Sequence, residues 1–128
     1  MREFGAVHVS SGATFHGAEE DLRRDPLKVM RAFSLWLETT VKGAPVFVSD
    51  NPAYDWQWIN SYFWQHLGFN PFGHSARRIG DYYAGLVGDW TASSHWKRLR
   101  VTKHDHHPVH DAQGNAEALL RMFKGERA

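Results

Sequence analysis

The first stretch of the chain is rich in β-branched and aromatic residues. Two such runs lie within "EFGAVHVSSGATFHGA", and Ser10, Ser11 and Gly12 separate them. Turn residues between two strand-like runs predict a β-hairpin, here over residues 3–17. The chain is therefore expected to begin with an antiparallel pair of strands.

Two longer segments have apolar residues at helical spacing. Asp25 suits the cap and Pro26 the first position of a helix that extends to Gly43. The segment "YDWQWINSYFWQHL" returns to that spacing and is followed by Gly68. Between them, the apolar run "APVFVSDNP" stops at turn residues, which predicts a buried strand. A strand, a turn and a helix are thus expected in direct succession.

The second half of the chain has a weaker pattern. We expect a short strand or extended connector over 75–80, a helix over 81–86, and a mobile basic loop over 87–102. The last helix is predicted from Pro108 to about Lys124. Its expected inward face consists of Ala112, Ala116, Leu119, Leu120 and Phe123. This order of elements predicts an α/β domain whose sheet mixes antiparallel and parallel strands.

Composition narrows the class of protein. A chain of 128 residues with 42% hydrophobic residues is about the size of one domain, so 1–128 is expected to be a single unit. Fifteen basic and fourteen acidic residues give a net charge of +1, so any contact with nucleic acid must be local. Cysteine is absent and no stretch is typical of a secretion signal or a membrane span. We therefore expect a soluble cytoplasmic protein without membrane contact.

Polar residues follow the predicted strand at 44–49. Asn51 lies at its end and Asp55 in the first turn of the next helix. Carboxylates at the end of such a strand can face a crevice and bind Mg²⁺, which prefers oxygen ligands. The alternative is that Asp50, Asn51 or Asp55 only caps the helix. The sequence leaves both interpretations open.

The segment "KHDHHPVHD" is a second polar cluster, placed directly before the last helix. His106 precedes Asp111 by five positions, so a loop histidine can stand beside a carboxylate on the helix. An imidazole that takes a proton from water beside a metal-binding carboxylate is the pair that metal-assisted hydrolysis uses. A solvated loop, adventitious binding of Zn²⁺ or Ni²⁺ by the histidines, and a helix cap are the alternatives.

Two motifs in this order resemble those of the DEDDh exonucleases, the superfamily of proofreading exonucleases and ribonuclease T. "NPAYDWQWI" resembles the second motif, and "HHPVHDAQGNAEALL" resembles the third. The segments "SDNPAYDWQWIN" and "NPFGHSARRIGD" are most similar in sequence to a branch of small bacterial and phage exoribonuclease-like proteins. The resemblance extends over about residues 2–123. It implies an RNase H-like fold and metal-dependent hydrolysis of single-stranded RNA or DNA from the 3′ end.

The resemblance also implies a role for individual residues. Asp55 and Asp111 would hold Mg²⁺ or Mn²⁺ in a two-metal site, and His106 would be the general base. Asn51 would support that site or the nucleotide. His104, His107 and His110 have no motif position and are expected to be ordinary loop residues.

The first motif of the family is absent from the sequence. The family has an Asp and a Glu separated by one residue on the first strand, whereas this chain starts with what resembles the second strand. The acidic residues at 19–21 lie beyond the hairpin and are expected to form a solvated turn. We therefore expect a sheet that lacks its first strand, an incomplete metal site, and impaired activity.

Aromatic and basic residues suggest how nucleic acid is held. Trp58, Tyr62 and Phe63 follow helical spacing and are expected to be buried, which leaves Tyr54 and Trp56 as candidates for stacking on bases. The basic residues before His106, Lys103 among them, can grip phosphates or form an ordinary solvated loop.

Two classes of function remain. The first is a metal-dependent 3′ to 5′ exonuclease, and the alternative is a non-catalytic nucleic-acid-binding or interaction domain with the same fold. An open strand edge also favours pairing with a second copy as a homodimer.

Overall fold

A β-hairpin opens the computed structural model, which describes residues 1–128. Strands β1 (Phe4–Val7) and β2 (Thr14–Gly17) pair antiparallel, with Phe4 opposite Gly17 and Val7 opposite Thr14. Gly12 lies in the connecting turn with φ of +77°, a backbone conformation that side chains with a Cβ rarely adopt. The predicted hairpin over residues 3–17 is confirmed.

Two helices follow the hairpin. Helix α2 (Pro26–Thr40) has the expected start, because the side chain of Asp25 accepts a hydrogen bond from Lys28 N at 3.1 Å. The acidic residues at 19–21 form the first turn of a short helix, α1 (Glu19–Arg24), rather than the expected loop. Their negative charge favours the N-terminal end of the α1 dipole, and Glu19 pairs with Arg2 at 3.2 Å.

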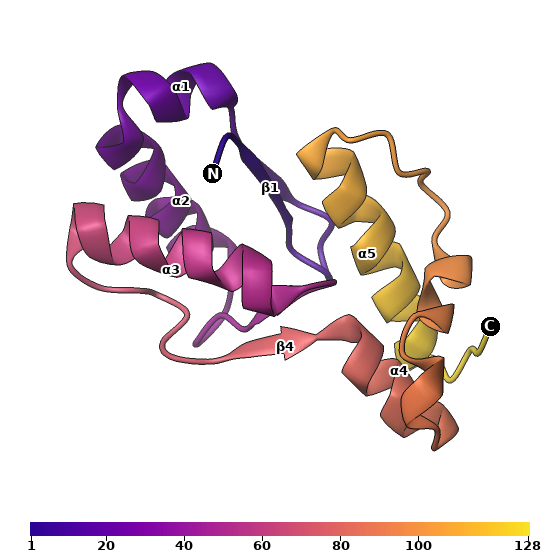
Figure 1. Ribbon diagram of the computed structural model, residues 1–128. Helices are drawn as coiled ribbons and strands as arrows, with labels where there is room; N and C mark the ends of the chain where they lie inside the picture. The colour runs from indigo at the N-terminus through magenta and orange to yellow at the C-terminus, as the bar shows by residue number, and fades with distance from the viewer.

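A strand, helix and strand unit forms the middle of the chain, as Figure 1 shows. Strand β3 (Phe47–Ser49) leads into helix α3 (Pro52–Leu67), which ends at Gly68 in the left-handed conformation. Strand β4 (Ala76–Arg78) then returns parallel to β3, with Val48 opposite Arg77. Antiparallel and parallel strands are thus both present, and the α/β class is confirmed. They form two separate two-stranded sheets, β1-β2 and β3-β4.

The segment 87–102 differs from the expected mobile loop. After helix α4 (Ile79–Val87), the chain forms two 3₁₀ helices, η1 (Trp90–Ala92) and η2 (His95–Leu99). Trp96 and Leu99 of η2 are almost completely buried, with 1% and 4% of their surface exposed. Burial of these two apolar side chains fixes the segment in place, because exposing them again would cost free energy.

Helix α5 (Pro108–Phe123) follows as expected, but its inward face differs in part. Leu120 and Phe123 are exposed at the surface, whereas Ala118 and Met122 are buried. The buried face is therefore rotated toward positions 118, 119 and 122, and Phe123 instead contacts Tyr82 of α4 edge to face.

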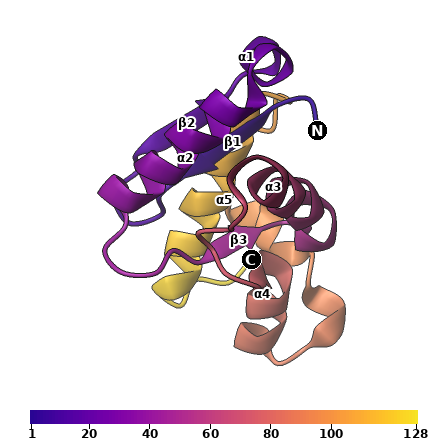
Figure 2. The same ribbon diagram turned by 90° about the vertical axis from the view of Figure 1, so that its left-hand side faces the viewer.

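Two groups of buried side chains make up the core. The first joins the hairpin, α1, α2 and α3, and consists of Phe4, Leu22, Val29, Met30, Phe33, Leu37, Ile59 and Phe63. The second joins α4, η1, η2 and α5, and consists of Ile79, Tyr83, Ala92, Trp96, Leu99, Ala118, Leu119 and Met122. Figure 2 shows α5 passing behind the hairpin toward α4.

The start of α5 lies directly against β1. A Cβ added at Gly5 would collide with the backbone of Pro108 and Val109, so only glycine permits this approach. The hairpin therefore determines where the polar start of α5 lies.

None of the helices combines the length and the apolar character that crossing a membrane requires.

Candidate functional site

The end of β3 and the start of α3 carry Asp50 and Asn51. The carboxylate of Asp50 pairs with Lys97 of η2, with Oδ2 and Nζ 3.3 Å apart, and its carbonyl accepts a hydrogen bond from Arg78 Nε. Asn51 stands at the N-cap position, yet its side chain makes no capping hydrogen bond and is exposed. The capping interpretation therefore does not hold for Asn51, and its amide is free to bind another group.

Asp55 lies in the first turn of α3, where the sequence predicted it. Removal from water by surrounding protein atoms raises the pKa of Asp55 above its usual range, and repulsion from Asp50 acts in the same direction. The neighbouring Ser49 hydroxyl and the backbone at Asn51 oppose this rise in the pKa without cancelling it. The Ser49 hydroxyl is buried and has no partner with hydrogen-bond geometry. Two carboxylates, Asp50 and Asp55, thus lie close together at this end of β3, and only that of Asp50 has an ion-pair partner.

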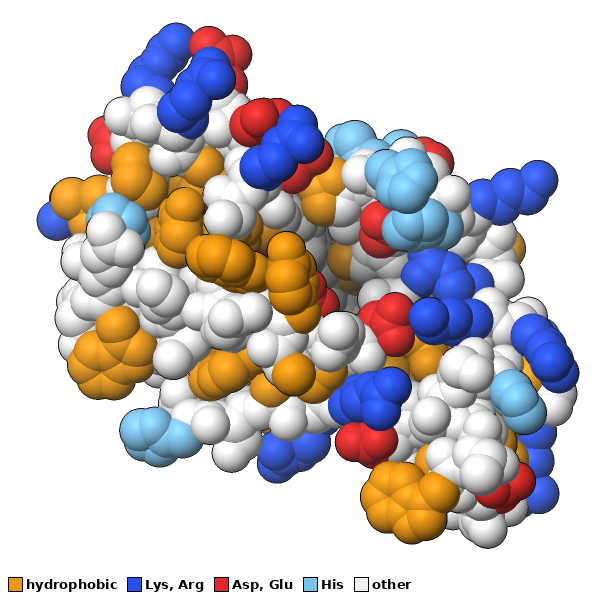
Figure 3. All heavy atoms as spheres, viewed as in Figure 1, with side chains coloured by type: hydrophobic (Ala, Val, Ile, Leu, Met, Phe, Trp, Pro, Cys, Tyr) orange, Lys and Arg blue, Asp and Glu red, His pale blue; other side chains and the backbone are white.

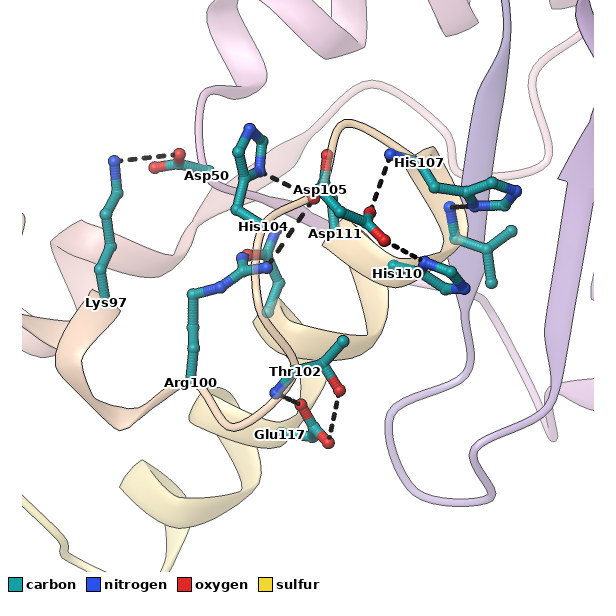
Figure 4. A network of polar contacts seen from close by, with 12 residues as sticks. Asp50, Lys97, Arg100, Thr102, His104, Asp105, His107, His110, Asp111 and Glu117 are labelled. Atoms are coloured by element: carbon teal, nitrogen blue, oxygen red, sulfur yellow. Dashed lines mark hydrogen bonds and ion pairs between the residues drawn. The ribbon is translucent and has the colours of Figure 1, made fainter.

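Asp111 lies in the first turn of α5 with 27% of its side chain exposed. Its Oδ1 is 2.7 Å from His104 Nδ1 and 4.0 Å from Arg100 Nη2. Neither contact has hydrogen-bond geometry, and the buried Oδ1 is left without a hydrogen bond. Figure 4 shows His104 and Arg100 directed at Asp111 from the segment that precedes α5. These two cationic or ionisable groups are the immediate neighbours of the carboxylate.

His106 does not contact Asp111 within ion-pair distance; its neighbour in space is His104. The two rings meet edge to face with their centroids 4.5 Å apart, and His106 is exposed. Its φ of +68° is the only positive value at a residue other than glycine. Such a conformation is strained for a residue with a Cβ and occurs often at functional sites. His104 has no motif position, so its contact with Asp111 was not predicted from the sequence.

The other two histidines of the segment shape its backbone. His107 Nδ1 accepts a hydrogen bond from Val109 N and so caps α5. Asp105 pairs with His110 Nδ1 at 2.6 Å and accepts from His107 N, and these bonds hold the pKa of Asp105 below its usual range. The cap interpretation is correct for His107. The loop is therefore ordered by its own side chains.

The aromatic residues of α3 divide differently from the expectation. Tyr54 is 58% exposed as predicted, but Trp58, which was expected to be buried, is 37% exposed and touches Tyr54 edge to face. Trp56 is half-buried and packs edge to face on Phe47 and Phe72. The exposed pair on the first two turns of α3 is therefore Tyr54 and Trp58.

Charge and apolar surface are separated around the site. Figure 3 shows a band of hydrophobic side chains over the α3 side, a group of histidines over the start of α5, and basic side chains below that group. A hollow lies between the hydrophobic band and the histidines. Lys103 is exposed in the segment before α5, as expected, and makes no ion pair. The hollow is thus bordered by hydrophobic side chains on one side and by histidines on the other.

The described residues do not complete a metal site. No group of three or more His, Cys, Asp or Glu side chains is placed to hold a metal ion. The Oδ1 atom of Asp111 faces His104 and Arg100, and the positive charge of Arg100 opposes the binding of a divalent cation at this oxygen. Asp55 and Asp111 alone therefore do not fit a two-metal centre.

One comparison with known proteins supports the resemblance. The Escherichia coli protein named 3′-5′ DNA exonuclease Cap18 is 37% identical over an alignment of 106 residues, which covers 77% of this chain and 56% of that protein. The chain thus spans little more than half the length of this relative. No protein-family model matches the sequence. The similarity supports an exonuclease family, whereas the DEDDh branch stays a prediction.

Proposed function

We propose that the protein is a 3′ to 5′ exonuclease that removes nucleotides from the ends of single-stranded nucleic acid. The observation that carries the proposal is the 37% identity to a protein named as a 3′-5′ DNA exonuclease. The chemistry of the site also supports the proposal. Asp55 and Asp111 lie at helix starts, and His106 is exposed and has a strained backbone. Because the relative is named for DNA, we take single-stranded DNA as the substrate to test first, with RNA of the same sequence beside it.

Each candidate residue would have its own role in the proposed reaction. The exposed imidazole of His106 would take a proton from the attacking water, the task for which a neutral histidine near pH 7 is suited. Asp55 and Asp111 would help to hold Mg²⁺ or Mn²⁺, which would supply positive charge beside the reacting phosphate. Lys103, which makes no ion pair, would attract the phosphate backbone, and Asn51 would hydrogen-bond the terminal nucleotide.

Stepwise shortening of an oligonucleotide tests the proposal. A 20-mer labelled at its 5′ end should give a ladder of products that are one nucleotide shorter at each step, and a phosphorothioate at the last 3′ linkage should block it. His106→Ala should lower the rate about 10²- to 10⁴-fold, the contribution of a general base. Cleavage inside a circular single strand, or shortening from the 5′ end, would contradict the proposal. The rate of shortening by the wild-type protein also shows whether its nuclease activity is impaired, as the absence of the first acidic motif leads us to expect.

We also propose that the reaction needs Mg²⁺ or Mn²⁺. Because few anionic ligands are close together, we expect weak binding, with an apparent Kd on the order of 10⁻³ M. Addition of EDTA should stop product formation, and a titration of each cation into the EDTA-treated protein should restore it. Full activity in EDTA would refute the metal requirement. It would not affect the conclusion on whether shortening proceeds from the 3′ end.

The exposed rings of α3 should stack on bases. Replacing Tyr54 or Trp58 by Ala should weaken binding of a single-stranded oligonucleotide by about 1–3 kcal/mol, since each ring is expected to support one base. Trp64→Ala is the matched control, because Trp64 is 52% exposed on the same helix but almost three turns away from Tyr54. Fluorescence anisotropy in EDTA measures the binding without hydrolysis. Equal losses in all three variants would show that the effect is not local.

Trp56 keeps its proposed role in a weaker form. Its ring packs against Phe47 and Phe72, so stacking on a base would use only its exposed part. Trp56→Ala should therefore reduce protein stability as well as binding.

A second candidate function has one observation in its favour. The absence of a group of three metal ligands is what a non-catalytic nucleic-acid-binding domain would show. That function predicts tight binding of single strands in EDTA and no shortening with any cation. Sedimentation velocity in the same buffer would test the expected homodimer.

A further inference from the structure

Arg100 lies between η2 and α5 in an unusually confined position. Its side chain is 14% exposed, and Nη1 donates a hydrogen bond to Asn115 Oδ1 on α5. A Cβ added at Gly114 would collide with the guanidinium group. The guanidinium therefore lies flat on the one position of α5 that has no side chain, and Asn115 fixes its orientation.

The second nitrogen of this guanidinium faces Asp111. Arg100 Nη2 is buried, has no hydrogen-bond partner, and lies 4.0 Å from Asp111 Oδ1, which is also buried. The distance is too long for a hydrogen bond, but the attraction between the two charges is strong because little water lies near them. Arg100 thus acts on Asp111 by its charge, from a position that Asn115 and Gly114 determine.

The two oxygens of Asp111 are consequently not equivalent. Oδ1 is buried beside Arg100 and His104, while 27% of the side chain as a whole is exposed. The exposed surface must then lie on the rest of the side chain, which includes the second oxygen. Holding the inner oxygen leaves the outer part of the carboxylate pointing away from the segment at 100–104 (Figure 4).

We propose that Arg100 is a positioning residue that sets the orientation of the Asp111 carboxylate in the nuclease reaction. The proposal rests on the proposed function for its catalytic consequence, but not for its geometry. If Arg100 only filled space, its hydrogen bond to Asn115 would be enough to hold the guanidinium in place. There would then be no reason for Nη2, which has no hydrogen-bond partner, to face the Asp111 carboxylate. Gly114 is then part of the same arrangement, because any side chain there displaces the charge.

Gly114→Ala is the sharpest test, since it moves the guanidinium without touching Asp111. We expect kcat to fall about 10- to 100-fold, the usual effect of losing a group that orients an active-site ligand, while KM for the oligonucleotide changes less than about twofold. Gly85→Ala is the matched control, because Gly85 is also within a helix and a Cβ there meets nothing within 4 Å. That variant should keep the kcat of the wild type.

Substitutions of Arg100 provide the second arm. Arg100→Gln removes the charge and should lower kcat as Gly114→Ala does. Arg100→Lys keeps the charge on a narrower group, so introducing it into the Gly114→Ala protein should restore part of the lost kcat. Rescue of this kind is not expected from a purely structural role.

A readout that does not depend on activity separates this inference from the proposed function. In protein labelled with ¹³C at the aspartate carboxyl carbons, Asp111→Asn identifies the Asp111 resonance. That resonance should move in Gly114→Ala and Arg100→Gln but not in Gly85→Ala. An unmoved resonance in folded Gly114→Ala protein, or an unchanged kcat, would overturn the role of Arg100. Wild-type protein that releases no nucleotide would refute the proposed function instead, and the resonance would still decide the inference.

Discussion

Asp55→Asn is expected to abolish most nuclease activity and, at neutral pH, to make the protein more stable. The loss of rate should be about 10²-fold or more, because Asp55 is proposed to help hold the divalent cation beside the reacting phosphate. The gain in stability follows from the pKa of Asp55, which partial burial and Asp50 hold above its usual range. An amide keeps the shape of the side chain without the unfavourable charge.

The pH dependence of this effect has a definite sign. Because the folded protein binds the Asp55 proton more tightly than the unfolded chain does, stability falls as pH rises through the folded pKa of Asp55. The Asn variant lacks this loss. Urea unfolding of both proteins should therefore show a difference that is small below the unfolded pKa, near 4, and grows as the pH rises toward 7.

Asp21→Asn, at an exposed carboxyl of α1, is the control for the Asp55 variant. We expect Asp21→Asn to lose only the interaction with the α1 dipole, about 0.3–1 kcal/mol, so its effect on stability should be small and opposite in sign to that of Asp55→Asn. An Asp55→Asn protein that is less stable than the wild type at pH 7 would show that Asp55 has a stabilising partner in the fold.

Asp111→Asn should lose activity to a similar extent but with the opposite change in stability. The variant leaves the guanidinium of Arg100, only 14% exposed, without a counter-charge. Removing one member of a buried pair is costly, and for this partly exposed pair at 4.0 Å we expect a loss of about 1–3 kcal/mol. Chemical denaturation at pH 7 measures it, and the loss should persist in 0.5 M salt because buried charges are poorly screened.

Asp81→Asn is the matched control for Asp111. Asp81 pairs with Arg78 at 3.5 Å, but both side chains are about half exposed, so its loss should cost about 0–1 kcal/mol and should vanish in salt. Equal losses in the two variants would contradict the assignment of Asp111 and Arg100 to a buried pair.

The regular elements of this fold were predictable because their signals are local. The turn at 10–12, the cap at Asp25 and the glycine at 68 each lie within a few residues of the element that they begin or end. The segment 87–102 was not predictable in this way. Its order comes from burial of Trp96 and Leu99 against α4 and α5, which lie outside the segment and before and after it in the sequence.

The candidate site was likewise predictable only where its signals are local. Asp55 and Asp111 lie in the first turns of their helices, which the helix patterns alone indicated. The partner of Asp111 depends on how the backbone turns at His106, whose positive φ no pattern announced, and so His104 was missed. The role of Arg100 was missed as well, because a basic run looks the same in sequence whether it is solvated or folded over a glycine.

The two core clusters carry one carboxylate each. Asp55 is on the helix whose Ile59 and Phe63 belong to the first cluster, and Asp111 is on the helix whose Leu119 and Met122 belong to the second. The gap between the two acids is therefore a property of how one cluster sits on the other, and neither local segment defines it. Since a misplacement of about 1 Å can cost on the order of 10²-fold in rate, we expect the rate of the proposed reaction to depend on the packing between the two clusters.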